Sequence, residues 1–193
     1  MTSPDQAILL NQLTSGDDQR AEAAALALAE LGPQVLPALQ DLLHSPDPDA
    51  RWWANRILAE LDSPQAASLL IESLQDTDIA VRQCAALALS YRPQQAAVAQ
   101  LIVDLDDPDH LLARLAADAL VAAGAMAVPA LLEVMQTGNQ AARLEAVRAL
   151  ALIADTRAIP TLFTALDEDS ALIEYWADEG LQRMGVGMTF FKP

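Results

Sequence analysis

The side chains that could carry out chemistry in this sequence are few and far apart. His44 and His110 are the only histidines, and Cys84 is the only cysteine. Nucleophile activation and metal binding both need several such groups close together, and neither histidine has a second one near it. A single cysteine forms no internal disulfide and no cysteine-based zinc site. The sequence therefore predicts no catalytic residue, no metal site and no cofactor.

Adjacent acidic residues are the other candidates for chemistry. A general acid or base needs a carboxylate in surroundings that shift its pKa, and nothing in the sequence places these pairs in an apolar site. We assign them to loops or helix surfaces, and we expect Cys84 to be a small buried hydrophobic residue. The pairs are Asp106 with Asp107, Asp167 with Glu168, and Asp178 with Glu179.

The charge of the chain limits its partners. Its 193 residues include 27 acidic and 11 basic side chains, for a formal charge of -16. Such a surface repels a phosphate backbone, so nucleic acid is excluded as a partner, whereas the charge can aid solubility or steer the chain toward a basic protein. The first residues, MTSPDQAILLNQL, lack the features of a secretory signal, and no apolar run of 18 residues occurs. We expect a cytoplasmic protein that binds no membrane.

A period of 30 or 31 residues organises the whole chain. One column holds only alanine, and the column four residues later holds only leucine, which places both on one face of a helix. The alanines are Ala24, Ala54, Ala85, Ala116, Ala146 and Ala177, and the leucines are Leu28, Leu58, Leu89, Leu120, Leu150 and Leu181. Small residues precede most of these leucines, Gly180 among them, which allows close packing of helices.

Two further columns describe a second helix in each repeat. They hold Leu9, Leu39, Leu70, Leu101, Leu131 and Leu162, and then Leu13, Leu43, Leu74, Leu105, Met135 and Leu166. A short polar residue between the two helices can cap the helix that follows. These candidate caps are Asp17, Asp47, Asp78, Asp109, Asn139 and Ser170, with Asp107 before Pro108 as an equal alternative to Asp109.

The columns predict twelve helices without a linker between domains. First helices are expected over 5–14, 34–43, 65–75, 95–105, 127–136 and 157–166. Second helices are expected over 18–31, 48–61, 79–91, 110–123, 140–154 and 171–184. The repeats then cover 5–32, 33–63, 64–92, 93–124, 125–155 and 156–185 of a single domain, 1–193. Residues 186–193 follow, and Phe190 and Phe191 are expected to cap the last repeat.

Several segments resemble HEAT repeats of the short PBS-lyase HEAT-like, or E-Z, type. They are DPDARWWANRILAEL (47–61), DTDIAVRQCAALALS (76–90) and QAARLEAVRALALIA (140–154). The resemblance implies an all-α fold, a right-handed α-α superhelix (solenoid) of six two-helix HEAT-like repeats. The arginine typical of the family is present as Arg51, Arg82 and Arg143, and we expect it to pair with a loop carboxylate such as Asp47 or Asp78.

The known activities of the family narrow the choice of function. The hydroxylase of the family needs several His-Glu pairs, and its DNA glycosylases need a basic surface; this sequence has neither. The resemblance leaves two functions: a scaffold or assembly factor that binds a protein on its concave face, and a phycobilin lyase subunit or bilin chaperone. A lyase of this type needs no cysteine of its own.

The candidate binding residues are aromatic and basic. The residue after the arginine column points away from the buried alanines and is Trp52 in the second repeat and Tyr175 in the sixth. The resemblance places second helices on the concave side, where such aromatics can anchor a partner. Trp53 and Trp176 point sideways and are expected to pack in the core. We predict a partner-binding surface made of Arg51, Trp52, Arg56, Arg82 and Tyr175.

Overall fold

The structure, a computed structural model, describes residues 4–168 and 170–186, which form six pairs of α-helices. The first helices are α1 (Pro4–Leu13), α3 (Leu36–Leu43), α5 (Pro64–Ser73), α7 (Val98–Asp104), α9 (Val128–Thr137) and α11 (Ile159–Ala165). The second helices are α2 (Asp18–Glu30), α4 (Pro48–Leu58), α6 (Ile79–Tyr91), α8 (His110–Ala123), α10 (Gln140–Ile153) and α12 (Ala171–Arg183). The predicted all-α fold of paired helices is confirmed.

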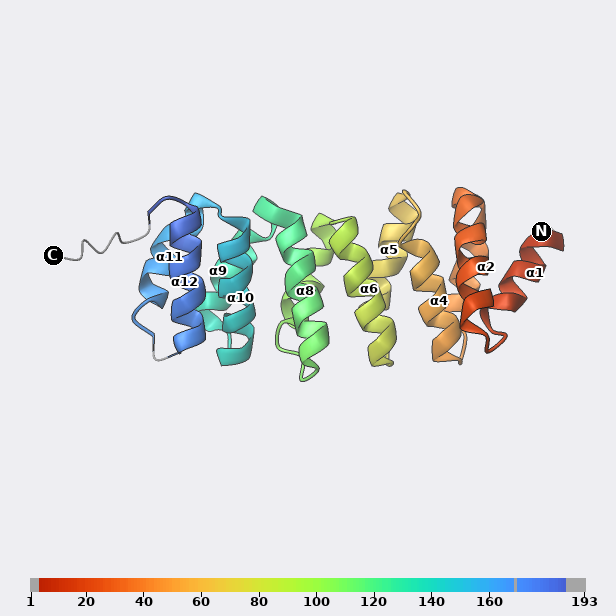
Figure 1. The fold of residues 1–193 in the computed structure, drawn as a ribbon, viewed down its shortest axis with the longest axis horizontal. Coiled ribbons are helices and arrows are strands. Elements are labelled where there is room, and N and C mark those ends of the chain that lie inside the picture. The colour runs from red at the N-terminus through yellow and green to blue at the C-terminus, as the bar shows by residue number, and fades with distance from the viewer. Residues whose placement is uncertain (1–3, 169, 187–193) are drawn as a thin grey trace. The chain divides into compact units, whose positions relative to one another are not determined.

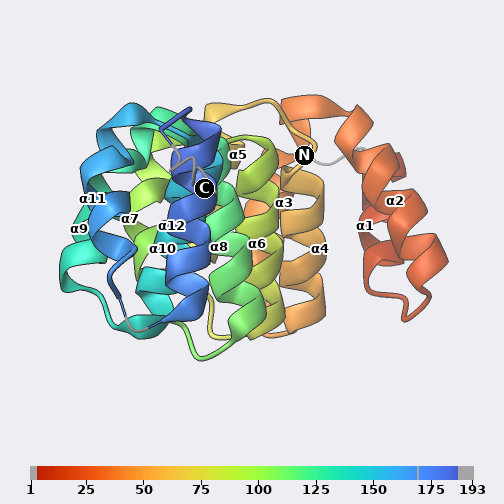
Figure 2. The same ribbon diagram turned by 60° about the vertical axis from the view of Figure 1, so that its left-hand side comes forward.

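The chain divides into two compact units, Met1–Arg92 and Pro93–Pro193. In the first unit α2 packs beside α4, α4 beside α6, and α3 beside α5 (Figure 1). In the second unit α8 packs beside α10 and α10 beside α12, with α7 beside α9 on the other side of the layer (Figure 2). Within each unit the pairs therefore follow one another as in a repeat solenoid. The single domain over residues 1–193 stays a prediction.

The repeat columns form the core of both units. Every alanine and every leucine of the two second-helix columns is buried. In the first helices most column residues are buried too, and those only half-buried are Leu9, Leu43 and Leu166. Because the buried side chains recur on one face of each helix, a single pair cannot cover its own leucines, and the neighbouring pair supplies the missing contacts.

The second helices begin where the capping residues predict. The carboxylates of Asp17, Asp47, Asp78 and Asp109 and the amide oxygen of Asn139 accept hydrogen bonds from first-turn amides. The structure decides between the two candidates before α8, because Asp109 caps the helix while Asp107 accepts the amide of Asp109 itself at 2.9 Å. Ser170 occupies the N-cap of α12, but its hydroxyl makes no capping bond.

Four first helices begin later than predicted, and each follows a short 3-10 helix. These turns are Gly32–Val35, Gln95–Ala97, Gly124–Met126 and Thr156–Ala158. Pro37, Pro129 and Pro160 lie in the first turns of α3, α9 and α11. Proline lacks an amide hydrogen and is tolerated in that turn, so these residues fix where the α-helix starts.

Two further predictions concern the ends and the environment of the chain. The predicted C-terminal cap lies outside the described residues except for Val186, so Phe190 and Phe191 are not placed. Among residues 4–168 and 170–186, no helix has the length and apolar character needed to cross a membrane.

Candidate functional site

The residues on the exposed side of α2, α4 and α6 can be identified from the positions of the buried alanines on the same helices. Each residue turns a helix by about 100°, so positions two residues before and after a buried alanine point away from the core. On α4 these positions around Ala54 are Trp52 and Arg56. The matching positions of α2 and α6 include Leu26 and Leu87. We call this surface of the first unit the second-helix face.

Large apolar side chains are exposed on the second-helix face. Leu26 is 47% exposed, Leu87 is 42% exposed, and Tyr91, one turn after Leu87, is 73% exposed. Trp52 on the helix between them is half-buried. Single exposed leucines are common in proteins, but three exposed apolar side chains and a half-buried tryptophan on one side of three adjacent helices are typical of an interaction site.

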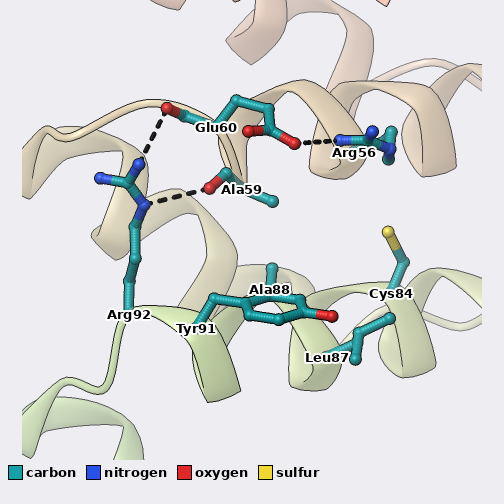
Figure 3. A pocket seen from close by; sticks show the side chains of 8 residues that line it. All are labelled: Arg56, Ala59, Glu60, Cys84, Leu87, Ala88, Tyr91 and Arg92. Atoms are coloured by element: carbon teal, nitrogen blue, oxygen red, sulfur yellow. Dashed lines mark hydrogen bonds and ion pairs between the residues drawn. The ribbon is translucent and has the colours of Figure 1, made fainter. Parts of the chain in front are cut away.

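A pocket of about 730 Å³ lies between α4 and α6 on this face. Figure 3 shows the Arg56 and Glu60 side chains along one side of it and Leu87 and Tyr91 along the other. Its lining residues are Arg56, Ala59, Glu60, Cys84, Leu87, Ala88, Tyr91 and Arg92. The pocket therefore combines an apolar wall from α6 with a charged rim that comes mainly from α4 and the turn after it.

The two arginines of the rim are bound by groups of the protein itself. Arg56 forms ion pairs with Glu60 at 2.6 Å and with Glu22 of α2 at 2.8 Å. Arg92 donates hydrogen bonds to the carbonyl oxygens of Ala59 at 3.1 Å and Glu60 at 3.0 Å (Figure 3). Because these cations are already neutralised or held, the apolar wall is the part of the pocket that is available to a partner.

Cys84 lines this pocket from the side of α6, and its surroundings disfavour the reactive thiolate. Its side chain is buried, and this burial raises the pKa of the thiol to about 12, against the opposing effect of the Arg56 charge. A thiol with such a pKa is almost entirely protonated at neutral pH, whereas nucleophilic attack requires the thiolate. The structure thus confirms Cys84 as a small buried hydrophobic residue.

A second hollow, of about 430 Å³, lies between α2 and α4. It is lined by Asp18, Glu22, Asp49, Trp52 and Trp53. The two indole rings are in edge-to-face contact, with centroids 4.9 Å apart and planes at 89°. Trp53 was expected in the core, but it is only half-buried because it forms a wall of this hollow. Trp52 and Arg56 of the predicted surface therefore line the hollows on opposite sides of α4.

Tyr175 belongs to the second unit and is exposed, as predicted. The rings of Tyr175 and Trp176 are in edge contact, with their centroids 5.3 Å apart. Trp176 was expected in the core, but it is only half-buried. Tyr175 borders a hollow of about 640 Å³ between α11 and α12. The other residues of this hollow are Phe163, Leu166, Asp167, Ala171, Glu174 and Asp178.

Arg51 and Arg82 point into the structure of the first unit. Arg51 donates two hydrogen bonds to the Asp76 carboxylate, at 2.7 and 2.8 Å, and a third to the Ser45 carbonyl at 3.0 Å. Arg82 donates to the Asp76 carbonyl at 2.9 Å. The predicted partners Asp47 and Asp78 act on Arg51 only through their charge, because Nε and Nη2 of Arg51 donate to the Asp76 carboxylate and Nη1 donates to the Ser45 carbonyl. A partner-binding role for Arg51 and Arg82 stays a prediction.

On α8 and α10 of the second unit, ion pairs occupy matching positions, whereas α12 carries the exposed Tyr175. Arg148, at the position of Arg56, is only 4% exposed and binds Asp118 at 2.8 Å and Glu145 at 2.9 Å. Arg114, at the position of Trp52, lies 3.6 Å from the same Glu145. A charge network that satisfies itself offers little to a partner.

Histidine and metal chemistry are poorly supported in the structure. His44 is exposed, and its Nδ1 lies 2.7 Å from the carbonyl oxygen of Gln40 in its own helix. His110 is exposed at the start of α8. Among the residues that the structure describes, no three His, Cys, Asp or Glu side chains gather in a way that could hold a metal ion.

The sequence profile of HEAT repeats matches residues 7–90, 36–121 and 98–182, and so spans most of the chain. The chain belongs to the HEAT repeat family. No curated protein matches the chain in sequence. The finer assignment of this HEAT protein to the PBS-lyase HEAT-like type stays a prediction.

Solved structures with the same helical architecture cover nearly the whole HEAT chain. An engineered protein is 26% identical, with a TM-score of 0.54, over 96% of this chain and 100% of its own. A designed armadillo repeat protein in complex with the peptide (KR)4 is 20% identical, with a TM-score of 0.54, over 94% and 100%. The CpcE–CpcF complex of phycocyanin lyase from Nostoc sp. PCC7120 is 22% identical, with a TM-score of 0.55, over 96% and 79%.

The exposed leucines and Tyr91 are the binding candidates that the sequence analysis did not include. Leu26 and Leu87 share the column of Arg56, two residues after the buried alanines of the HEAT repeats. That column could have identified them, since a leucine on the side opposite the core columns has no neighbour to cover it. Tyr91 lies one turn further along the same side of α6.

Proposed function

We propose that this HEAT repeat protein is a non-enzymatic scaffold or assembly factor that binds a protein partner on the second-helix face of its first unit. The observation that carries the proposal is the apolar patch of the exposed Leu26, Leu87 and Tyr91 and the half-buried Trp52 on three neighbouring helices. Covering such a patch removes apolar surface from water and favours association by roughly 25 cal/mol per Å². The cytoplasmic location expected from the sequence is part of the same proposal.

The chemistry of the patch suits a protein partner better than a small molecule. Tyrosine and tryptophan dominate binding energies at protein interfaces, where charged residues form the rim. Here the charged rim is already organised, since Arg56 is held between Glu22 and Glu60. A partner can therefore bury the apolar wall of the pocket without leaving an arginine unpaired.

Two of the similar structures support binding as the general role. One is a designed armadillo repeat protein in complex with a peptide, and the other is the complex of CpcE and CpcF of phycocyanin lyase. Both are under 25% identical to this chain, so the likeness concerns the fold. The location of the face comes from the residues of this chain alone.

The test is affinity capture with a variant that disrupts the patch. We expect Leu87→Asp to lose a protein that the wild type retains from a native lysate of the organism encoding it, because a carboxylate would be buried in the apolar interface. Leu172→Asp is the matched control, since Leu172 is also exposed, at 59% against 42% for Leu87, but lies on α12. Mass spectrometry of the captured proteins provides the measurement.

The control decides the outcome. A protein retained by the wild type and by Leu172→Asp, but lost with Leu87→Asp, supports the proposal. If every captured protein is retained equally by all three forms while circular dichroism shows that they are folded, the second-helix face of the first unit is not the binding surface.

A role as a phycobilin lyase subunit or bilin chaperone is the alternative. The likeness to the phycocyanin lyase complex is one of fold, and no feature of the pocket in Figure 3 is specific to a bilin. A lyase-type protein would change the absorption spectrum of added phycocyanobilin, whereas a plain scaffold would not.

A further inference from the structure

The hollow between α2 and α4 differs in chemistry from the pocket between α4 and α6. Its walls are the two tryptophans, and its rim is formed by three carboxylates, Asp18, Glu22 and Asp49. No basic side chain lines it among the described residues. The pocket beyond α4, in contrast, has two arginines on its rim. The two sides of one helix thus offer different groups to the same partner.

The tryptophan pair presents a surface that attracts cations. An indole ring carries negative charge density on its face and positive density at its edge. Trp52 and Trp53 are arranged edge to face, at 89°, and neither is fully buried. A cation within about 6 Å of the face of a tryptophan is attracted to the ring, and more strongly where water is excluded.

The electrostatic balance around the hollow is negative. The N-termini of α2 and α4 lie beside it and contribute about +0.5 charge each. Arg56 pairs with Glu22, but it shares its charge with Glu60 on the other side. Arg20, which also lies on α2, pairs with the Asp17 cap at 3.2 Å. The carboxylates of Asp18 and Asp49 therefore exceed the local positive charge, and both are exposed to an incoming ligand.

We propose that this hollow binds a lysine or arginine side chain from a basic segment of the partner protein. The apolar stem of such a side chain can lie against the indoles while its charged end reaches the carboxylates. The formal charge of -16 favours approach of a basic segment from a distance. The inference rests on the proposed function and specifies its partner. That partner would place one basic side chain in the hollow and apolar side chains against Leu87 and Tyr91.

Isothermal titration calorimetry with the synthetic peptide (KR)4 tests the proposal. We expect the wild type to bind the peptide, and we expect Trp52→Leu, which keeps apolar volume but removes the indole, to bind about tenfold more weakly. Asp18→Asn with Asp49→Asn is expected to weaken binding by a similar factor. Melting curves show whether each variant is folded, because both aspartates also stabilise the first turns of their helices.

A charge-matched control separates the hollow from general attraction. Asp41→Asn with Glu72→Gln also removes two negative charges, but from exposed positions on α3 and α5, and should change the affinity less than twofold. Equal losses in the two double variants, or a wild type that does not bind the peptide, would overturn the inference. Those results leave the proposed function standing, because Leu87→Asp tests it with the native partner and without the peptide.

Discussion

Replacing Arg51 with methionine is expected to lower the free energy of unfolding by about 3 kcal/mol. Arg51 joins the second repeat to the loop of the third, where its guanidinium holds both oxygens of Asp76. Each of the two side chains is only 12% exposed. Methionine fills most of the space but leaves a carboxylate without its cation, and stranding a largely buried charge is costly. Chemical denaturation followed by circular dichroism measures the change.

A second substitution shows whether the stranded charge is the cause. Asp76→Asn keeps an oxygen that can accept the amide of Asp78, which Asp76 binds at 2.8 Å. We expect the double variant Arg51→Met, Asp76→Asn to be more stable than Arg51→Met alone, because it no longer buries an unpaired charge. If Arg51→Met costs less than about 1 kcal/mol, the ion pair is no more than a surface contact.

The same pair gives the stability a defined dependence on pH. The hydrogen bonds from Arg51 are the main cause that lowers the pKa of Asp76, and burial opposes them. A lowered pKa means that the pair stabilises the fold above the unfolded pKa of about 4, and that this contribution is lost as the pH falls through the native value. The gap in stability between wild type and Arg51→Met should therefore narrow between pH 5 and pH 2, roughly.

Much of the fold could be predicted because it is encoded locally. A helix cap lies within three residues of the amides that it binds, and an alanine four residues before a leucine places both on one side of one helix. Both signals repeat six times, so each supports the others. Only Ser170 fails to make its capping bond, and the neighbouring caps still fix the register of its repeat.

The candidate site could be predicted only in part, because exposure depends on neighbours that are distant in sequence. Trp52 and Arg56 were identified from their angle on the helix, which is a local property. The partner of Arg51 is 25 residues away, and which loop carboxylate it reaches depends on the path of that loop. Arg148 shows the same limit, because its burial results from Asp118 in the preceding repeat.

The columns also explain why two exposed leucines were overlooked. Leucine fills the buried columns, so the residue type of Leu26 and Leu87 gives no sign that they are exposed. They stand two residues after the buried column alanine, which puts them on the opposite side of the helix. Arg56 occupies the same position in the second repeat. The same position holds a buried, ion-paired arginine in the second unit. The same register therefore carries exposed leucines in the first unit and a buried, ion-paired arginine in the second.

Replacing Gly180 with valine is expected to destabilise the protein by about 3 kcal/mol. A Cβ atom at this position would lie 2.9 Å from both the Cα and the Cβ of Ala151 on α10, and 2.9 Å from a methyl carbon of Leu162. The Leu162 side chain can move, but the backbone of Ala151 cannot give way without shifting α10. The close approach of α10 and α12 therefore depends on the missing side chain. Thermal unfolding should show a decrease in Tm of roughly 6–12 °C.

Two variants separate this packing effect from helix propensity. Ala122→Val places valine at an exposed position of α8 and should cost less than about 1 kcal/mol. Gly180→Ala combined with Ala151→Gly removes one of the clashing methyl groups, so the pair should be more stable than the sum of the single effects predicts. Equal costs for Gly180→Val and Ala122→Val would mean that α10 and α12 do not approach so closely. A large difference with coupling to Ala151 would identify Gly180 as the residue that sets the spacing between these two repeats.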